Sequence, residues 1–188
     1  LEARAAARAG FTVMRIDLAW CAMERQPGDY DWSGSERRVA LLEKYGIRPQ
    51  ALVGLAPDWA VKRDWVYERP ERGPCGNKLP EPALWKGFLE KMAAHFGTRI
   101  PFYDLYNEPD LIGCGNFTVD DYVESFNAGA RGVHAGCPTA KVLTGGIACW
   151  RVTVDTKRDF LPRGVLGTAQ DFDILAIHEH GEPKGLFR

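Results

Sequence analysis

Hydrophobic and polar positions divide the chain into short apolar runs and longer stretches with helical spacing. In the stretch 82–95, Leu84, Phe88 and Met92 recur every four residues, which places one apolar stripe along a helix. The apolar runs lack this period and are short, as expected for strands that are covered on both faces. The pattern predicts helices at 2–9, 33–45, 82–95, 118–133 and 156–168, and strands at 11–20, 49–55, 100–106, 141–148 and 172–178.

Local signals mark the ends of several predicted helices. Ser33 with Glu36, and Thr118 with Asp121, have the spacing of a capping box, in which side chains bind the first unpaired N–H groups of a helix. Glycines follow three of the helices, where the chain commonly adopts a left-handed backbone. These glycines are Gly10, Gly46 and Gly97.

Strands that alternate with helices predict a parallel sheet. No linker and no change in composition divides residues 1–188, so we expect a single domain. Intervals of roughly 30–50 residues between strands fit a (β/α)8 TIM barrel with enlarged loops, which takes about 250 residues for eight strands. Five strands then make an incomplete barrel. The alternative is a complete doubly wound sheet of five strands, although no glycine-rich phosphate loop follows the first strand.

The composition is that of an ordinary globular domain and excludes two classes of partner. The 24 Lys and Arg residues against 25 Asp and Glu give a net charge of −1, with no basic excess for nucleic acid. No apolar run approaches the roughly 20 residues of a membrane span. The five cysteines lack zinc-finger spacing. Cys75 and Cys114 lie in glycine-rich loops, which leaves open a disulfide between them or five free thiols.

Polar and aromatic side chains gather where the predicted strands end, which is the edge at which parallel αβ barrels carry out chemistry. Glu108 lies between Asn107 and Pro109, directly after an apolar strand. Burial there would raise the pKa of its carboxyl, so that it could protonate a glycosidic oxygen near neutral pH. The alternative is a solvated turn, because all four residues of Asn-Glu-Pro-Asp suit turns. Other residues near strand ends are Arg15, Asp17, Trp20, Trp59, Gly145, Gly146, His178 and His180.

Four segments resemble, in order, signatures of glycoside hydrolase clan A, and most nearly its family 39 xylosidases and exopolysaccharide glycosidases. FYDLYNEPDL (102–111) is similar to the fourth barrel strand, whose Asn-Glu-Pro carries the acid/base Glu. The second strand with its preceding helix is resembled by ARAGFTVMRIDLAW (7–20). The loop, helix and strand that come next are resembled by MERQPGDYDWSGSERRVALLEKYGIRPQALV (23–53), and the sixth strand by FDILAIHEHGEP (172–183). The resemblance implies a partial glycosidase barrel without its first, seventh and eighth strands, from a protein that degrades polysaccharides.

The resemblance also implies roles for individual residues. Glu108 would be the general acid and then the general base of a retaining glycoside hydrolase acting on β-linked oligo- or polysaccharides. Asn107 would bind the sugar 2-hydroxyl, and Arg15 would support the charge of the nucleophile. Four further substrate-binding positions are Trp20 and Trp59 along the sugar subsites, His178 beside the nucleophile, and His180, which stands where the clan often has Tyr.

The nucleophile of this clan lies on the seventh strand, so we expect it outside the present chain. Glu179 and Glu182 are the only carboxylates after His178. Glu179 alternates away from the face of its histidine neighbours, and Glu182 lies in a Gly-Glu-Pro turn. We therefore expect the 188-residue chain alone to be inactive. The chemistry requires neither a cofactor nor a metal, and the substrate class favours a secreted or periplasmic location.

Two other functions remain open at this point. His178 and His180 share one face of a predicted strand and could hold a metal, as in a barrel metallohydrolase, although the His-x-His of that family lies on the first strand. A carbohydrate-binding pseudoenzyme could keep the aromatic subsites without catalysis.

Overall fold

Four parallel strands form the sheet in this computed structural model, which describes residues 2–65, 78–110, 117–148 and 160–178. The strands pair in chain order, β1-β2-β3-β4, with Ile16 opposite Ala51 and Tyr103 opposite Val142. The strands are β1 (Val13–Ala19), β2 (Arg48–Gly54), β3 (Phe102–Leu105) and β4 (Lys141–Leu143). The helices are α1 (Glu2–Arg8), α2 (Trp20–Met23), α3 (Ser33–Glu43), α4 (Pro82–Phe96), α5 (Val119–Gly136) and α6 (Val165–Thr168).

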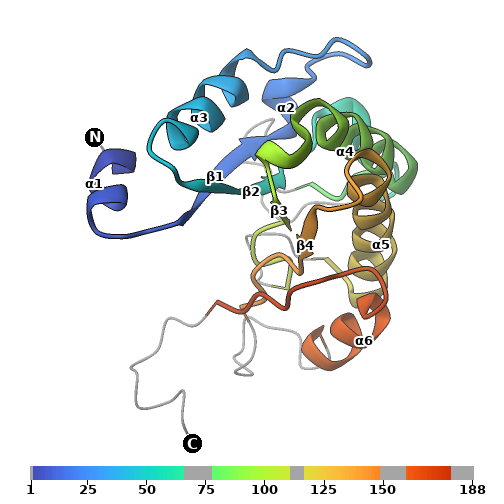
Figure 1. Cartoon of the computed structure of the whole chain (residues 1–188). Coiled ribbons are helices and arrows are strands. Elements are labelled where there is room, and N and C mark those ends of the chain that lie inside the picture. The colour runs from blue at the N-terminus through green and yellow to red at the C-terminus, as the bar shows by residue number, and fades with distance from the viewer. Residues whose placement is uncertain (1, 66–77, 111–116, 149–159, 179–188) are drawn as a thin grey trace, which may run out of the picture.

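The order of the strands distinguishes between the two fold classes that the sequence left open. A doubly wound sheet reverses its strand order at a switch point and carries helices on both faces. Here each strand lies beside its predecessor, and α3, α4 and α5 lie on one side of the sheet (Figure 1). This arrangement differs from that of a doubly wound sheet and agrees with the one expected for a barrel wall. Among the described residues the sheet is open, with β1 at one edge.

The core lies between the sheet and these helices. Alternate residues of β2 and β3 point toward the helices and are completely buried, because side chains alternate across a strand. Of the stripe predicted for α4, Phe88 and Met92 are buried, together with Phe96 one turn further on, whereas Leu84 at its start is 42% exposed. The buried strand residues are Ala51, Val53, Tyr103 and Leu105.

Most predicted elements are confirmed, and the largest differences lie after β3. The predicted strand 141–148 is regular only to Leu143, because Gly145 and Gly146 adopt φ angles of 83° and 56° and turn the chain. The predicted strand 172–178 runs parallel beside β4 but is irregular, with isolated bridges at Ile174 and Ile177. The short helix α2 was not predicted. Of the predicted helix 156–168, residues 160–168 form a π-helical turn followed by α6, and the rest lies outside the described residues.

The two predicted capping boxes have different outcomes. The hydroxyl of Thr118 accepts the N–H of Asp121 at 3.0 Å, which confirms the cap at the start of α5. The cap at Ser33 was wrong, because Ser33 already lies within α3 and its N–H donates to the Asp31 carboxylate at 2.9 Å. Glu36 instead pairs with Arg99 at 2.8 Å.

Arg99 joins α3 to the end of α4 and provides a pH-dependent contribution to stability. Its guanidinium donates to both carboxylate oxygens of Glu43, at 2.8 and 3.0 Å, and these bonds hold the pKa of that carboxyl below its usual 4.5. A carboxyl whose pKa is lowered by folding stabilises the folded state at pH values above its pKa in the unfolded chain. This stabilisation is lost as the pH falls through its pKa in the folded protein.

Replacing Arg99 with Met should therefore lower the free energy of unfolding by roughly 0.5–1 kcal/mol at pH 7, since the pair is partly exposed. The loss should be smaller at pH 3, where Glu43 is increasingly protonated in both proteins. Urea unfolding of parent and variant at both pH values measures the difference. An equal loss at pH 7 and pH 3 would show that Arg99 acts by packing alone.

The state of the cysteines contradicts one of the two alternatives that the sequence left open. Cys21 is disulfide-bonded, so the alternative of five free thiols is wrong. Cys137 is free and buried. Cys75 and Cys114, whose pairing the sequence suggested, lie outside the described residues. In the described part of the chain, no helix combines the length and apolar character needed to cross a membrane.

Candidate functional site

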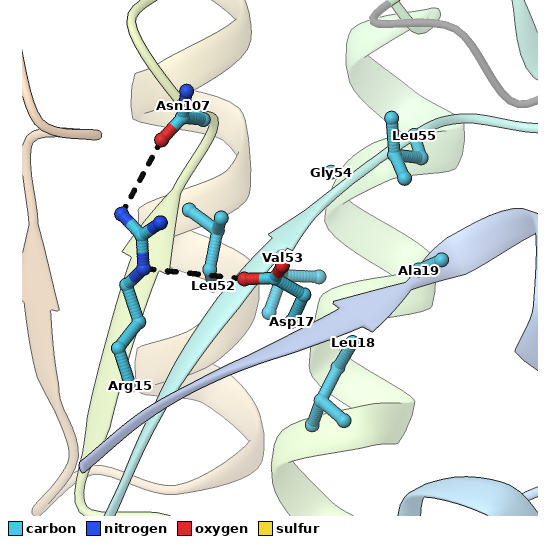
Figure 2. Close-up of a pocket in the computed structure, with 9 residues that line it drawn as sticks. All are labelled: Arg15, Asp17, Leu18, Ala19, Leu52, Val53, Gly54, Leu55 and Asn107. Carbon is cyan, nitrogen blue, oxygen red and sulfur yellow. Dashed lines mark hydrogen bonds and ion pairs between the residues drawn. The ribbon is translucent and has the colours of Figure 1, made fainter.

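The face of the sheet opposite the helices carries polar side chains toward the carboxyl ends of the strands. On β1, Arg15 and Asp17 lie on this face, while Met14 and Ile16 pack toward α1 and α3. A cavity of about 250 Å³ opens here, and Figure 2 shows the Arg15 side chain extending across it toward Asn107. The cavity is lined by Arg15, Asp17, Leu18, Ala19, Leu52, Val53, Gly54, Leu55 and Asn107.

Three separate segments bring four of the predicted site residues into one hydrogen-bonded row. Nη1 of Arg15 donates to Oδ1 of Asn107 at 3.3 Å and lies 3.5 Å from Nε2 of His178. Nδ1 of His178 lies 2.9 Å from Oε1 of Glu108. Because a guanidinium only donates, the Nε2 of His178 is the acceptor and its Nδ1–H points at the Glu108 carboxylate. Residues as far apart as Arg15 and His178 thus meet at one edge of the sheet.

The turn that carries Glu108 is buried and conformationally strained. Tyr106 and Glu108 have φ angles of 70° and 51°, a region that residues other than glycine rarely adopt. Each such residue costs on the order of 1 kcal/mol or more and persists only where its surroundings hold it. Here the N–H of Tyr106 donates to Val53 and that of Glu108 to Gly145, both at 2.9 Å. Glu108 is 9% exposed, so the alternative of a solvated turn was wrong.

Two glycines after β4 make room for the row of polar side chains. A Cβ at Gly146 would lie 2.2 Å from Nε2 of His178, so that only glycine lets the imidazole pack against this backbone. A Cβ at Gly145 would lie 2.1 Å from the carbonyl oxygen of Leu105. The predicted strand-end glycines therefore act by allowing close approach of neighbouring groups.

Asp104 is a site residue that the sequence reasoning missed. It is 1% exposed and accepts hydrogen bonds at 3.0 Å from Nε2 of Gln50 and from the N–H of Gly145. Burial raises the pKa of its carboxyl, against the opposing effect of these two bonds and of the nearby Arg15 charge. A charged residue within the apolar run FYDLY was the available signal.

The aromatic residues predicted for sugar binding have different positions. Trp20 has no exposed surface, stacks on Phe88 at 4.7 Å between ring centroids and donates its indole N–H to Glu24 at 2.7 Å. It is part of the core, so its predicted place along a sugar subsite was wrong. Trp59 is half-buried beside it and donates its indole N–H to the carbonyl of Arg25.

The metallohydrolase alternative finds no support in the surroundings of His178. Both ring nitrogens face protein groups, and the neighbour of Nε2 is the cationic Arg15, which would repel a metal ion. Within the described ranges, no three His, Cys, Asp or Glu side chains are grouped for metal binding. His180, the second histidine of that hypothesis and of the predicted substrate site, lies outside them.

Comparison with known proteins gives matches among solved structures. No family model and no curated protein matches the sequence. A family 39 glycoside hydrolase from Bacteroides cellulosilyticus superposes with a TM-score of 0.73 at 23% identity, over 96% of this chain and 35% of that one. A monomeric β-xylosidase from Caulobacter crescentus gives 0.71 at 19% identity, over 96% of this chain and 38% of that one.

The chain has the fold of these glycosidases. A third structure extends the likeness to another type of enzyme, xylanase 10B from Thermotoga petrophila in complex with xylobiose, with a TM-score of 0.63 at 14% identity, over 95% of this chain and 55% of that one. The resemblance to family 39 and to other clan A glycosidases is thus confirmed for the fold. The chain spans about a third to a half of the length of the three structures that it matches.

Proposed function

We propose that the protein is a retaining glycoside hydrolase of β-linked oligo- or polysaccharides, with Glu108 as its general acid and base. The observation that carries the proposal is the Glu108 carboxyl, which is almost buried at the carboxyl end of β3 and 2.9 Å from His178. The shared fold with glycosidases supports it, because active sites of parallel αβ barrels lie at this end of the strands.

The geometry around Glu108 suits proton transfer to a glycosidic oxygen. Oε1 accepts from His178, and this bond orients the carboxyl for proton transfer to the leaving group. After the first step, the same carboxylate removes a proton from the attacking water. Asn107 accepts from Arg15 through Oδ1, which leaves its amide Nδ2 to donate to a sugar hydroxyl. His178 is a positioning residue that fixes the orientation of the carboxyl.

A retaining mechanism requires a second carboxylate as the nucleophile, about 5–5.5 Å from the acid/base. Asp104 and Asp110 are the carboxylates nearest to Glu108 along the chain, and they are 1% and 0% exposed. A buried carboxylate of this kind cannot reach an anomeric carbon. The clan that the chain resembles carries its nucleophile on the seventh strand, so we assign the nucleophile to a part of the protein outside this sequence, and we propose that the 188-residue chain alone is inactive.

The substrate class follows from the site and its neighbours. The polar inner face of the sheet, with Arg15, Asp17 and Asn107 around the cavity, offers hydrogen-bond partners for several sugar hydroxyls. The matched structures include a β-xylosidase and a xylanase, so β-xylosides are the first substrates to try. We assign Trp59 to the edge of the sugar site, and the proposed chemistry needs no cofactor.

The test is the stereochemistry of hydrolysis by the protein expressed from its complete reading frame. Aryl β-glycosides of xylose, glucose and mannose are incubated with the enzyme, and the first-formed sugar anomer is followed by proton NMR. We expect the β-anomer to appear first and to mutarotate later. First formation of the α-anomer would overturn the retaining mechanism. Binding of xylan without hydrolysis of any substrate would instead indicate a carbohydrate-binding protein.

A further inference from the structure

The buried carboxylate of Asp104 links three segments of the sheet. It lies on β3 and accepts from Gln50 on β2 and from the N–H of Gly145 after β4, both at 3.0 Å. Burying a carboxylate is unfavourable unless hydrogen bonds compensate for the lost water, so its two donors fix its position. The carboxylate therefore holds the backbone of Gly145 at a defined distance from β3.

The backbone of Gly145 continues this linkage to the turn that carries Glu108. Its N–H donates to Asp104, and its carbonyl accepts the N–H of Glu108 at 2.9 Å. Gly145 packs so closely on β3 that an added Cβ would meet the carbonyl oxygen of Leu105 at 2.1 Å. A shift of Gly145 would therefore remove the hydrogen bond that holds Glu108 in its strained conformation.

We propose that Asp104 is a positioning residue, which orients the Glu108 carboxyl through the Gly145 backbone. This inference rests on the proposed function of Glu108 as the acid/base. Asp104 itself is 1% exposed, so we assign it no direct contact with substrate. Its role is to keep Glu108 at the angle needed for proton transfer, where displacements of about 1 Å can cost as much as 100-fold in rate.

A double-mutant cycle in the protein from its complete reading frame tests the inference. Asp104→Ala removes both hydrogen-bond acceptors, and we expect it to lower kcat/KM on a phenyl β-glycoside by roughly 10- to 100-fold. In the Glu108→Ala background the same change should cost less than about threefold, because the group that Asp104 positions is absent. Equal losses in the two backgrounds would overturn the inference.

Two further measurements separate positioning from a general structural effect. Asp104→Asn should retain kcat/KM within about threefold, because its amide oxygen still accepts from Gly145 and the Gln50 amide can reverse. On a dinitrophenyl β-glycoside, whose dinitrophenolate departs without protonation, Asp104→Ala should lose much less kcat/KM than on the phenyl compound. A loss of the same size on both substrates would show that Asp104 acts on the fold as a whole.

A matched control is Asp173→Ala. Asp173 likewise accepts a backbone N–H, that of Val142 at 2.9 Å, but within β4 and not at the turn that follows it. The variant Asp173→Ala should lower the stability of the protein without changing the ratio of kcat/KM between the phenyl and the dinitrophenyl glycoside. If Glu108→Ala itself leaves kcat/KM unchanged on the phenyl glycoside, the proposed function fails. If Glu108→Ala lowers kcat/KM but Asp104→Ala costs the same in both backgrounds, the proposed role of Asp104 fails and that of Glu108 stands.

Discussion

Replacing Glu108 with Gln should lower kcat/KM on a phenyl β-glycoside by on the order of 100- to 10,000-fold, the usual contribution of general acid–base catalysis. Gln keeps the size of the side chain and can still accept from Nδ1 of His178, which lies 2.9 Å from the carboxylate in the parent. It cannot deliver a proton to the leaving oxygen. A dinitrophenyl glycoside needs little protonation, so its kcat/KM should fall far less. Steady-state kinetics on both substrates measure the difference.

The control for this substitution is Glu90→Gln, an identical chemical change on the exposed side of α4. It should leave kcat/KM unchanged on both substrates. Normal hydrolysis of the phenyl glycoside by Glu108→Gln would remove the residue from the mechanism. An equal loss on both substrates would assign Glu108 to binding or folding, since neither depends on the leaving group.

Hydrophobic patterning predicted much of the fold, because helices bury one regular stripe and the strands are short apolar runs. The stripe of α4 and the apolar run of β3 were recognisable without any knowledge of what they contact. The position of Glu108 followed from the same reasoning, since a residue just after a buried strand of a parallel sheet lies at its functional edge. The contact between Glu108 and His178 required the fold, because the two residues are 70 positions apart.

The missed features depend on tertiary contacts that leave weak signals in the sequence. Trp20 follows β1 as a site residue would, but α2 begins there and turns the ring into the core. At the start of α3 it is the Asp31 side chain, and not that of Ser33, that accepts a backbone N–H, and either residue type suits that role. The importance of Asp104 arises from donors on β2 and after β4. No local pattern shows that both reach one carboxylate.

Close packing of α5 on α4 predicts a large loss of stability from a single methyl group. A Cβ at Gly132 would lie 2.4 Å from the carbonyl oxygen of Lys86, and backbone at that distance can move only if the helices separate. Gly132→Ala should therefore lower the free energy of unfolding by about 1–3 kcal/mol, as expected for overpacking. The urea midpoint of the protein from its complete reading frame should fall, with little change in the slope.

Gly87→Ala provides the matched comparison on the facing helix. A Cβ at Gly87 meets nothing within 4 Å, so the added methyl group causes no clash there. Alanine restricts the unfolded chain more than glycine does, and this should raise the free energy of unfolding by about 0.5–1 kcal/mol. The same substitution thus has opposite signs at two helical glycines. If Gly132→Ala were also stabilising, α4 and α5 could move apart without loss of packing, and the glycines of α5 would not be required for the contact.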